Sequence, residues 1–177
     1  MTREPVQDLG PATTSPGARW AAARPWVTTL ARLLLGAVWI AAGASKVTDL
    51  AASVRAVRAY RLLPEGVVPA VGAGLPLVEI VLGLLLVAGL GTRLAAAVSA
   101  LLLVAFVVGI GAAWGRGLRI DCGCFGGGGT LAAGRAPSYL PELARDVGLL
   151  LVAGVLLRWP YSRASVDALL FGTPEET

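Results

Sequence analysis

Long apolar stretches separated by short polar segments dominate the pattern of the chain. Residues 27–44 contain one charged side chain, Arg32; residues 67–90 also contain one, Glu79; residues 94–114 contain none. A helix rises about 1.5 Å per residue, so stretches of this length cross the roughly 30 Å hydrocarbon core of a bilayer. The pattern predicts three membrane-spanning helices at these positions.

A fourth apolar run, residues 147–157, is too short to cross a bilayer alone. A fourth span therefore has to begin near residue 139 and end near residue 159. That extension brings Glu142, Arg145 and Asp146 to membrane depth or just above it. Charges at that depth are expected to face the interior of a helix bundle.

Residues 49–63 have a different period, typical of an amphipathic helix. Apolar and basic side chains both recur at helical spacing here, the apolar ones being Leu50, Val54, Val57 and Leu62 and the basic ones Arg55, Arg58 and Arg61. Such a helix lies in the interface between water and lipid. Pro64 is expected to end it.

The predicted fold is all-α: a polytopic membrane protein with a four-helix transmembrane bundle over residues 27–160 and an amphipathic interfacial helix between spans one and two. Residues 1–26 are interpreted as a flexible leader, residues 115–138 as a Gly-rich loop and residues 161–177 as a polar tail. With four spans, both termini lie on one side of the membrane, and the amphipathic helix and the loop lie together on the other.

The first apolar stretch has a second interpretation, a secretory signal. Arg19 and Arg24 would then form its charged region, and the small residues 42–44 its cleavage site. We favour a retained span because both the leader and the apolar run are long for a signal.

Composition and charge support a membrane protein. Of the 177 residues, 56% are hydrophobic and only 15% charged, too few charges to cover a water-soluble globule. The net charge of +4 does not indicate nucleic-acid binding. The basic residues lie between apolar runs and do not cluster on one water-exposed surface. The chain has no His, which excludes imidazole metal ligands and His-dependent catalytic triads.

Cys122 and Cys124, with Gly123 between them, are the strongest chemical signal. A disulfide between residues two apart closes a small, strained ring, so the bond is easily reduced. Such a bond is better suited to thiol-disulfide exchange than to a structural cross-link. Three interpretations remain open: a redox-active dithiol, a Cu(I) site of two thiolates, and inert structural cysteines. The copper site would lack further soft ligands, since the only Met is Met1.

The residues around the pair set its reactivity. Arg116 and Arg119 are expected to favour the thiolate, whereas Asp121 opposes it. Gly123 removes the side chain that would most hinder a tight turn.

The charged residues within the spans, Arg32, Glu79 and Arg145, form a second candidate site. Each costs roughly 2.5–3.5 kcal/mol if it faces lipid, so all three are expected in a polar network inside the bundle. For Arg32 and Arg145 the alternative is snorkelling to a nearby interface. Glu79 is expected to pair with Arg32 or Arg145, because its short, central carboxylate cannot reach an interface.

The segments RLLLGAVWIAAGASKVTDL, AYRLLP, LPLVEIVLGLLLVAGLGTR, GRGLRIDCGCFG and LARDVGLLLVAG resemble the methylamine-utilisation MauE family within the DoxX-like membrane proteins. The resemblance covers about residues 30–157. It carries the functional positions of the family onto Arg32, Lys46, Tyr60, Pro64, Glu79, Arg116, Gly117, Cys122, Cys124, Phe125 and Arg145. Asp146 departs from the expected Asn.

The resemblance implies a four-helix protein that works beside a thioredoxin-like periplasmic protein while a disulfide-rich enzyme matures. The Cys loop would then face the exoplasmic side and the termini the cytoplasm, a choice that the basic residues alone leave open. The expected function is a membrane thiol-disulfide relay. The alternatives are a non-catalytic membrane scaffold and a carrier of Cu(I) or a small solute. A lipid-soluble quinone is a candidate electron acceptor, with no residue identifying its pocket.

Overall fold

The computed structural model describes residues 16–123, 128–131, 134–159 and 165–167. Within these residues the chain forms five helices and one two-stranded hairpin. In chain order they are α1 (Pro16–Val47), α2 (Leu50–Ala59), α3 (Val68–Ala88), α4 (Thr92–Gly115), β1 (Ile120–Asp121), β2 (Gly129–Thr130) and α5 (Tyr139–Arg158).

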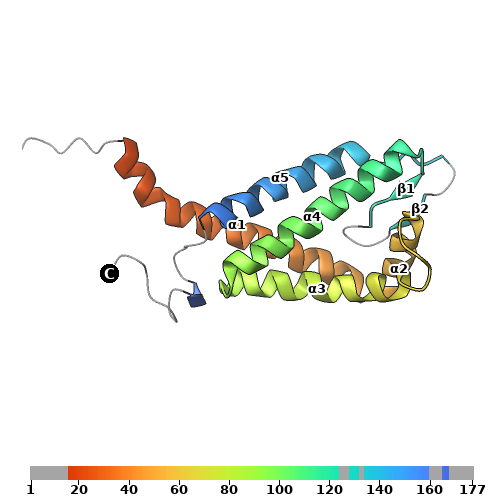
Figure 1. Ribbon diagram of the computed structural model, residues 1–177, viewed down its shortest axis with the longest axis horizontal. Coiled ribbons are helices and arrows are strands. Elements are labelled where there is room, and N and C mark those ends of the chain that lie inside the picture. The colour runs from red at the N-terminus through yellow and green to blue at the C-terminus, as the bar shows by residue number, and fades with distance from the viewer. Residues whose placement is uncertain (1–15, 124–127, 132–133, 160–164, 168–177) are drawn as a thin grey trace, which may run out of the picture.

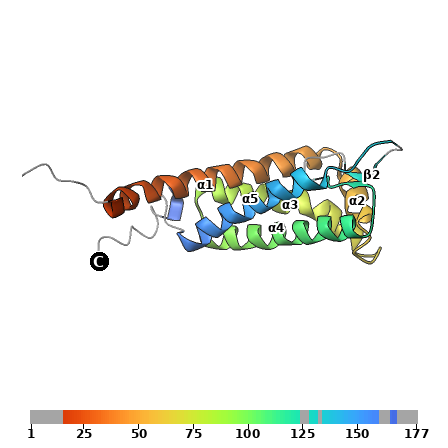
Figure 2. The same ribbon diagram turned by 90° about the horizontal axis from the view of Figure 1, so that it is seen from above.

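Four long helices lie side by side in an elongated bundle (Figures 1 and 2). Helix α1 packs against α3 and α5, and α4 packs against α5 and α3. The short helix α2 and the β1–β2 hairpin lie together at one end of the bundle, and the start of α1 and the end of α5 lie at the other. The hairpin that flanks the Cys loop therefore lies at the opposite end of the bundle from the start of α1 and the end of α5.

Three helices of the described chain are long and apolar enough to cross a membrane: residues Ala23–Val47, Val68–Ala88 and Thr92–Gly115. The protein is therefore a multi-pass membrane protein. Helix α5 coincides with the predicted fourth span, but its charged residues keep it outside this set.

Helix α1 begins earlier than the sequence pattern predicts. It starts at Pro16, so the second half of the supposed leader, up to Trp26, is helical. The physical reason is local: the three consecutive alanines at 21–23 favour helix strongly. Pro25 lies inside the helix, where its missing amide removes one backbone hydrogen bond without ending the helix. The Thr29 hydroxyl donates to the Pro25 carbonyl at 2.7 Å.

Helix α2 confirms the predicted amphipathic helix, although it ends at Ala59, before Pro64. The Asp49 carboxylate caps its first turn by accepting from the Ala52 amide at 2.8 Å. Its buried face lies on α3, where the Ser53 hydroxyl donates to the Gly72 carbonyl at 2.6 Å. Its basic side chains are exposed, so the helix presents a charged face at the end of the bundle.

Small residues allow α1 and α3 to approach closely. A Cβ atom at Gly43 would lie 2.6 Å from the Pro76 carbonyl oxygen, and one at Gly83 would lie 2.7 Å from that of Gly36. Close backbone approach through glycine is a common way to pack membrane helices. By contrast, a Cβ atom at Gly74 would meet no atom within 4 Å.

Part of the predicted polar tail docks onto the bundle. The Asp167 carboxylate accepts hydrogen bonds from the Gly91 and Thr92 amides at 2.9 and 3.1 Å. These two amides belong to the start of α4, where amides lack partners within the helix. Asp167 therefore caps α4 from a distant part of the sequence.

Candidate functional site

Cys122 directly follows β1 and is half-buried at the end of the bundle. Two tyrosines hold this segment in place. The Tyr60 hydroxyl donates to the Cys122 carbonyl at 3.3 Å, and the Tyr139 hydroxyl donates to the Leu118 carbonyl just before β1. Tyr139 also accepts from the Ile120 amide at 3.4 Å, so the strand is tied to the first turn of α5.

Gly123 is required by the turn that follows Cys122. Its φ is +69°, a conformation that favours glycine, and its amide donates to the Asp121 carboxylate at 3.2 Å. A Cβ atom at Gly123 would lie 2.9 Å from the Cβ of Ala56 on α2. Cys124 and Phe125 lie outside the described residues, so the predicted Cys122–Cys124 pair stays a prediction.

Arg145 on α5 is the basic residue that the structure places beside the sulfur. Its Nη2 atom lies 3.9 Å from Cys122 Sγ. The same guanidinium forms an ion pair with Asp146 at 2.9 Å, and the Asp146 side chain is only 3% exposed. This pair fixes the guanidinium beside the sulfur, and a neighbouring cation favours the thiolate form of a cysteine.

Two carboxyl groups complete the surroundings of Cys122. One ligand atom each from Asp121, Cys122 and Glu142 lie within 4.8 Å of one another. Glu142 stands in the first turn of α5, one helical turn before Arg145. Cys122 therefore has one cation that favours the thiolate and two carboxyl groups that can accept its proton but oppose the thiolate when they are ionised.

Arg116 and Arg119, the cations expected beside the thiolate from their place in the sequence, have a different role in the structure. Arg116 donates to the Tyr60 carbonyl at 2.5 Å and to the Ala112 carbonyl at 3.0 Å, which joins the end of α4 to the segment after α2. Arg119 donates to the Arg135 carbonyl at 2.6 Å. Arg116 thus connects two segments outside the loop, and Arg119 stabilises the loop backbone.

Glu79 pairs with Lys46. The Lys46 ammonium lies 2.5 Å from Glu79 Oε1, and the two side chains are 6% and 0% exposed. The predicted pairing of Glu79 with Arg32 or Arg145 is therefore wrong. The sequence pattern does not reveal Lys46 as the partner, because only the packing of α1 on α3 turns this residue at the end of the first span inward.

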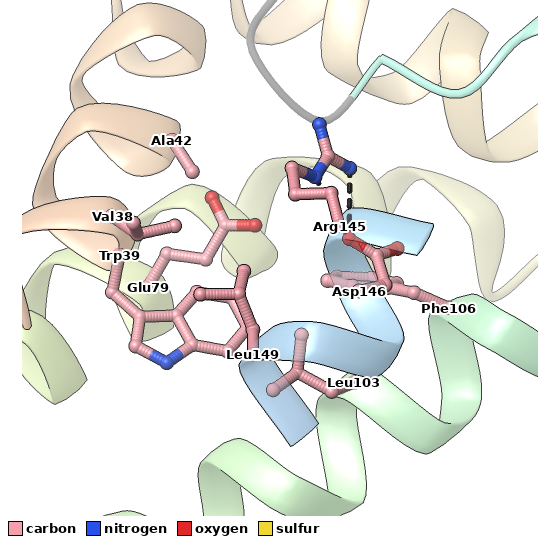
Figure 3. Close-up of a pocket in the computed structure, with 9 residues that line it drawn as sticks. All are labelled: Val38, Trp39, Ala42, Glu79, Leu103, Phe106, Arg145, Asp146 and Leu149. Atoms are coloured by element: carbon pink, nitrogen blue, oxygen red, sulfur yellow. Dashed lines mark hydrogen bonds and ion pairs between the residues drawn. The ribbon is translucent and has the colours of Figure 1, made fainter. Parts of the chain in front are cut away.

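A small cavity lies between Glu79 and the Arg145–Asp146 pair (Figure 3). Its volume is about 20 Å³, room for about one water molecule. Glu79 faces it from α3, Trp39 from α1, and Arg145 and Asp146 from α5. Arg145 thus contacts the Cys loop and also lines the cavity that Glu79 faces.

Arg32 belongs to the other end of the bundle. It lies fourteen residues before Lys46 on α1, which corresponds to about 21 Å along the helix. Its buried guanidinium packs against Gly89, after α3, and interacts electrostatically with Asp167. Of the three predicted network members, only Glu79 and Arg145 share a cavity.

Cu(I) prefers soft thiolate and thioether ligands, whereas the described neighbours of the Cys122 sulfur supply carboxylate oxygens and a guanidinium. Cys124, the second thiolate of the predicted copper site, lies outside the described residues.

A family model described as methylamine utilisation protein MauE matches residues 24–158, well over half of the chain. No curated protein matches the chain, and no solved structure matches it.

Proposed function

Because the chain belongs to the MauE family, which implies a role in methylamine utilisation, we propose that it is a membrane thiol-disulfide relay that acts with a thioredoxin-like partner. The observation that carries the proposal is the contact between Arg145 Nη2 and Cys122 Sγ at 3.9 Å. A cation beside a half-exposed thiol is the arrangement expected of an exchanging cysteine, because the thiolate is the reactive form.

We infer that α5 is a fourth span. Its outward positions Leu140, Ala144, Val147 and Leu151 are all exposed and recur at helical spacing, whereas Asp146 is buried. A helix with an apolar outer stripe and inward charges is suited to lipid contact on one face only. The relay would then have both termini in the cytoplasm and Cys122 on the exoplasmic side, where conditions are oxidising.

The proposed exchange runs from the partner to the membrane protein. A thiolate of the partner attacks the Cys122–Cys124 disulfide, a mixed disulfide forms, and one cysteine of the pair leaves as a thiolate. The second thiolate of the partner then attacks the mixed disulfide. The products are an oxidised partner and a reduced Cys122–Cys124 pair, so two electrons have moved into the membrane protein.

Arg145 supports this step by stabilising the thiolate of Cys122, and Glu142 is placed to take up or return a proton nearby. Cys122 is half-buried directly after β1, at the end of the bundle where α2 lies, so part of its side chain is open to a partner.

Trapping of the mixed disulfide tests the relay. Cys122→Ser and Cys124→Ser are expressed separately with the candidate thioredoxin-like protein, and a variant lacking both cysteines is the control. We expect one of the single variants to form a covalent adduct that dithiothreitol releases. A relay is contradicted if the three variants give the same pattern on a non-reducing gel.

A further inference from the structure

A second, larger cavity lies beside Cys122, under helix α2. Its volume is about 260 Å³, close to the lower end of small-molecule sites, which hold about 300–1,000 Å³. Cys122 and Lys46 both line it, together with the aromatic side chains of Tyr60 and Phe106. We call it the α2 cavity.

Most of the wall of the α2 cavity is apolar, and its margin faces lipid. Val71 on α3 and Ala105 on α4 line it and are exposed on the outer surface of the bundle, as is Leu62 in the segment after α2. Both α3 and α4 are candidate membrane spans. A ligand that reaches this cavity from the side therefore comes from the membrane.

Lys46 supplies a charged group to the otherwise mostly apolar wall. The Lys46 ammonium is 6% exposed and donates one hydrogen bond to Glu79, although an ammonium has three protons to donate. A hydrocarbon tail offers such a group no acceptor, whereas a ring with carbonyl oxygens does. The aromatic walls suit a flat ring.

From these features we propose that the α2 cavity binds the ring of a lipid-soluble quinone, with a carbonyl oxygen directed to Lys46. This inference rests on the proposed relay, because it names the acceptor of the electrons that the relay collects. The cavity places the acceptor against Cys122, at the point where the exchanging sulfur meets the membrane interior.

The step balances in electrons and atoms. The reduced Cys122–Cys124 pair loses two electrons and two protons and forms its disulfide. The quinone takes up both electrons and both protons and leaves as a hydroquinone. Lys46 supplies a hydrogen bond to the developing oxyanion, and the Glu142 carboxyl group lies close enough to Cys122 to accept its proton.

Gly109 on α4 gives a direct test of the site. A Cβ atom there would lie 3.6 Å from the Tyr60 ring, so an alanine fits, whereas a leucine extends into the α2 cavity. Gly111 is the matched control: it lies on the same helix, is exposed, and a Cβ atom there would meet no atom within 4 Å.

The binding experiment uses decylubiquinone and protein that carries Cys122→Ser, so that it does not depend on thiol chemistry. The protein is reconstituted in nanodiscs, and quinone binding is compared between the parent, Gly109→Leu and Gly111→Leu. We expect Gly109→Leu to weaken binding about tenfold or more and Gly111→Leu to leave it unchanged. Equal binding to all three proteins would overturn the site.

The electron-transfer experiment uses the cysteine-containing protein after reduction. We expect one hydroquinone to form for each pair of thiols lost, more slowly in Gly109→Leu than in Gly111→Leu. If Gly109→Leu does not fold, Ala105→Phe at the margin replaces it, with the exposed Ala97→Phe as control. Equal rates in the cavity variant and its control would overturn the assignment.

The two proposals fail separately. Site-specific quinone binding without any trapped mixed disulfide removes the relay and keeps the quinone site. If a mixed disulfide is trapped but Gly109→Leu does not change quinone binding, the relay stands and the quinone site is contradicted.

Discussion

Lys46 on α1 and Glu79 on α3 form a buried ion pair, with 2.5 Å between Nζ and Oε1. The pair joins two of the candidate membrane spans and lies between two cavities, because Glu79 faces the small one and Lys46 the α2 cavity. Lys46 and Glu79 thus link the packing of the bundle to the candidate redox site.

Glu79→Gln should leave Lys46 buried without a counter-charge and destabilise the protein by about 3–5 kcal/mol. The double variant Lys46→Met with Glu79→Gln should recover part of this loss, because no buried charge remains. Thermal unfolding in detergent measures both. Glu65→Gln is the control: Glu65 pairs with Arg58 on the exposed surface, and its loss should change stability by less than about 1 kcal/mol. A Glu79→Gln protein that melts with the parent would contradict the buried pair.

Gly83→Ala and Gly74→Ala should change the stability of the protein in opposite directions, although both positions lie on α3. A Cβ atom at Gly83 would be 2.5 Å from Ile40 Cγ1, so alanine should destabilise by roughly 1–3 kcal/mol. At Gly74 the space is open, and alanine should stabilise the helix by roughly 0.5–1 kcal/mol. The changes in melting temperature of the two variants, each relative to the parent, test the α1–α3 interface. If both changes have the same sign, this close packing is contradicted.

Arg145→Gln should slow alkylation of Cys122 by iodoacetamide at pH 7 by up to about tenfold, because the guanidinium no longer stabilises the thiolate. The measurement is made in a Cys124→Ser background so that one thiol reacts. Arg145→Lys should keep much of the rate, since it keeps a positive charge. The exposed Arg135→Gln should keep the full rate. Unchanged alkylation in Arg145→Gln, with the fold intact by melting, would remove Arg145 from the site.

The topology makes a prediction about labelling in whole cells. After reduction, a membrane-impermeant maleimide should label Cys122 without permeabilisation, and a tag at either terminus should stay protected from protease. The mass of the purified protein should show no cleavage after Ala44, because α1 packs against α3 on both sides of that residue. Labelling only after permeabilisation would reverse the orientation.

The purified protein should show a reversible two-electron reduction with a midpoint potential above about −300 mV. Such a potential is expected for a strained disulfide between residues two apart. It should carry no stoichiometric copper, because the described oxygen ligands near Cys122, from Asp121 and Glu142, are hard ligands that Cu(I) does not prefer. Free-thiol titration, metal analysis and a redox titration on one preparation decide between a redox-active disulfide and a Cu(I) site. Bound copper with no accessible disulfide state would favour the carrier.

The sequence alone was sufficient to locate the apolar helical segments, though not the start of α1, and to show that Glu79 needs a partner. Apolar runs of about 20 residues have to satisfy their backbone groups internally in lipid, so hydropathy places the helices with few alternatives. A central carboxylate in such a run also requires a partner, whatever the fold.

The identity of each partner was decided by tertiary structure. Lys46 stands at the end of a span in the sequence, and only the packing of α1 on α3 turns it toward Glu79. Arg116 and Arg119 are near Cys122 in sequence, yet the hairpin and Tyr139 fold the loop back onto α5 and place Arg145 at the sulfur. Sequence spacing determines contacts within one helix, whereas contacts between helices depend on how their surfaces interlock, which no single segment encodes.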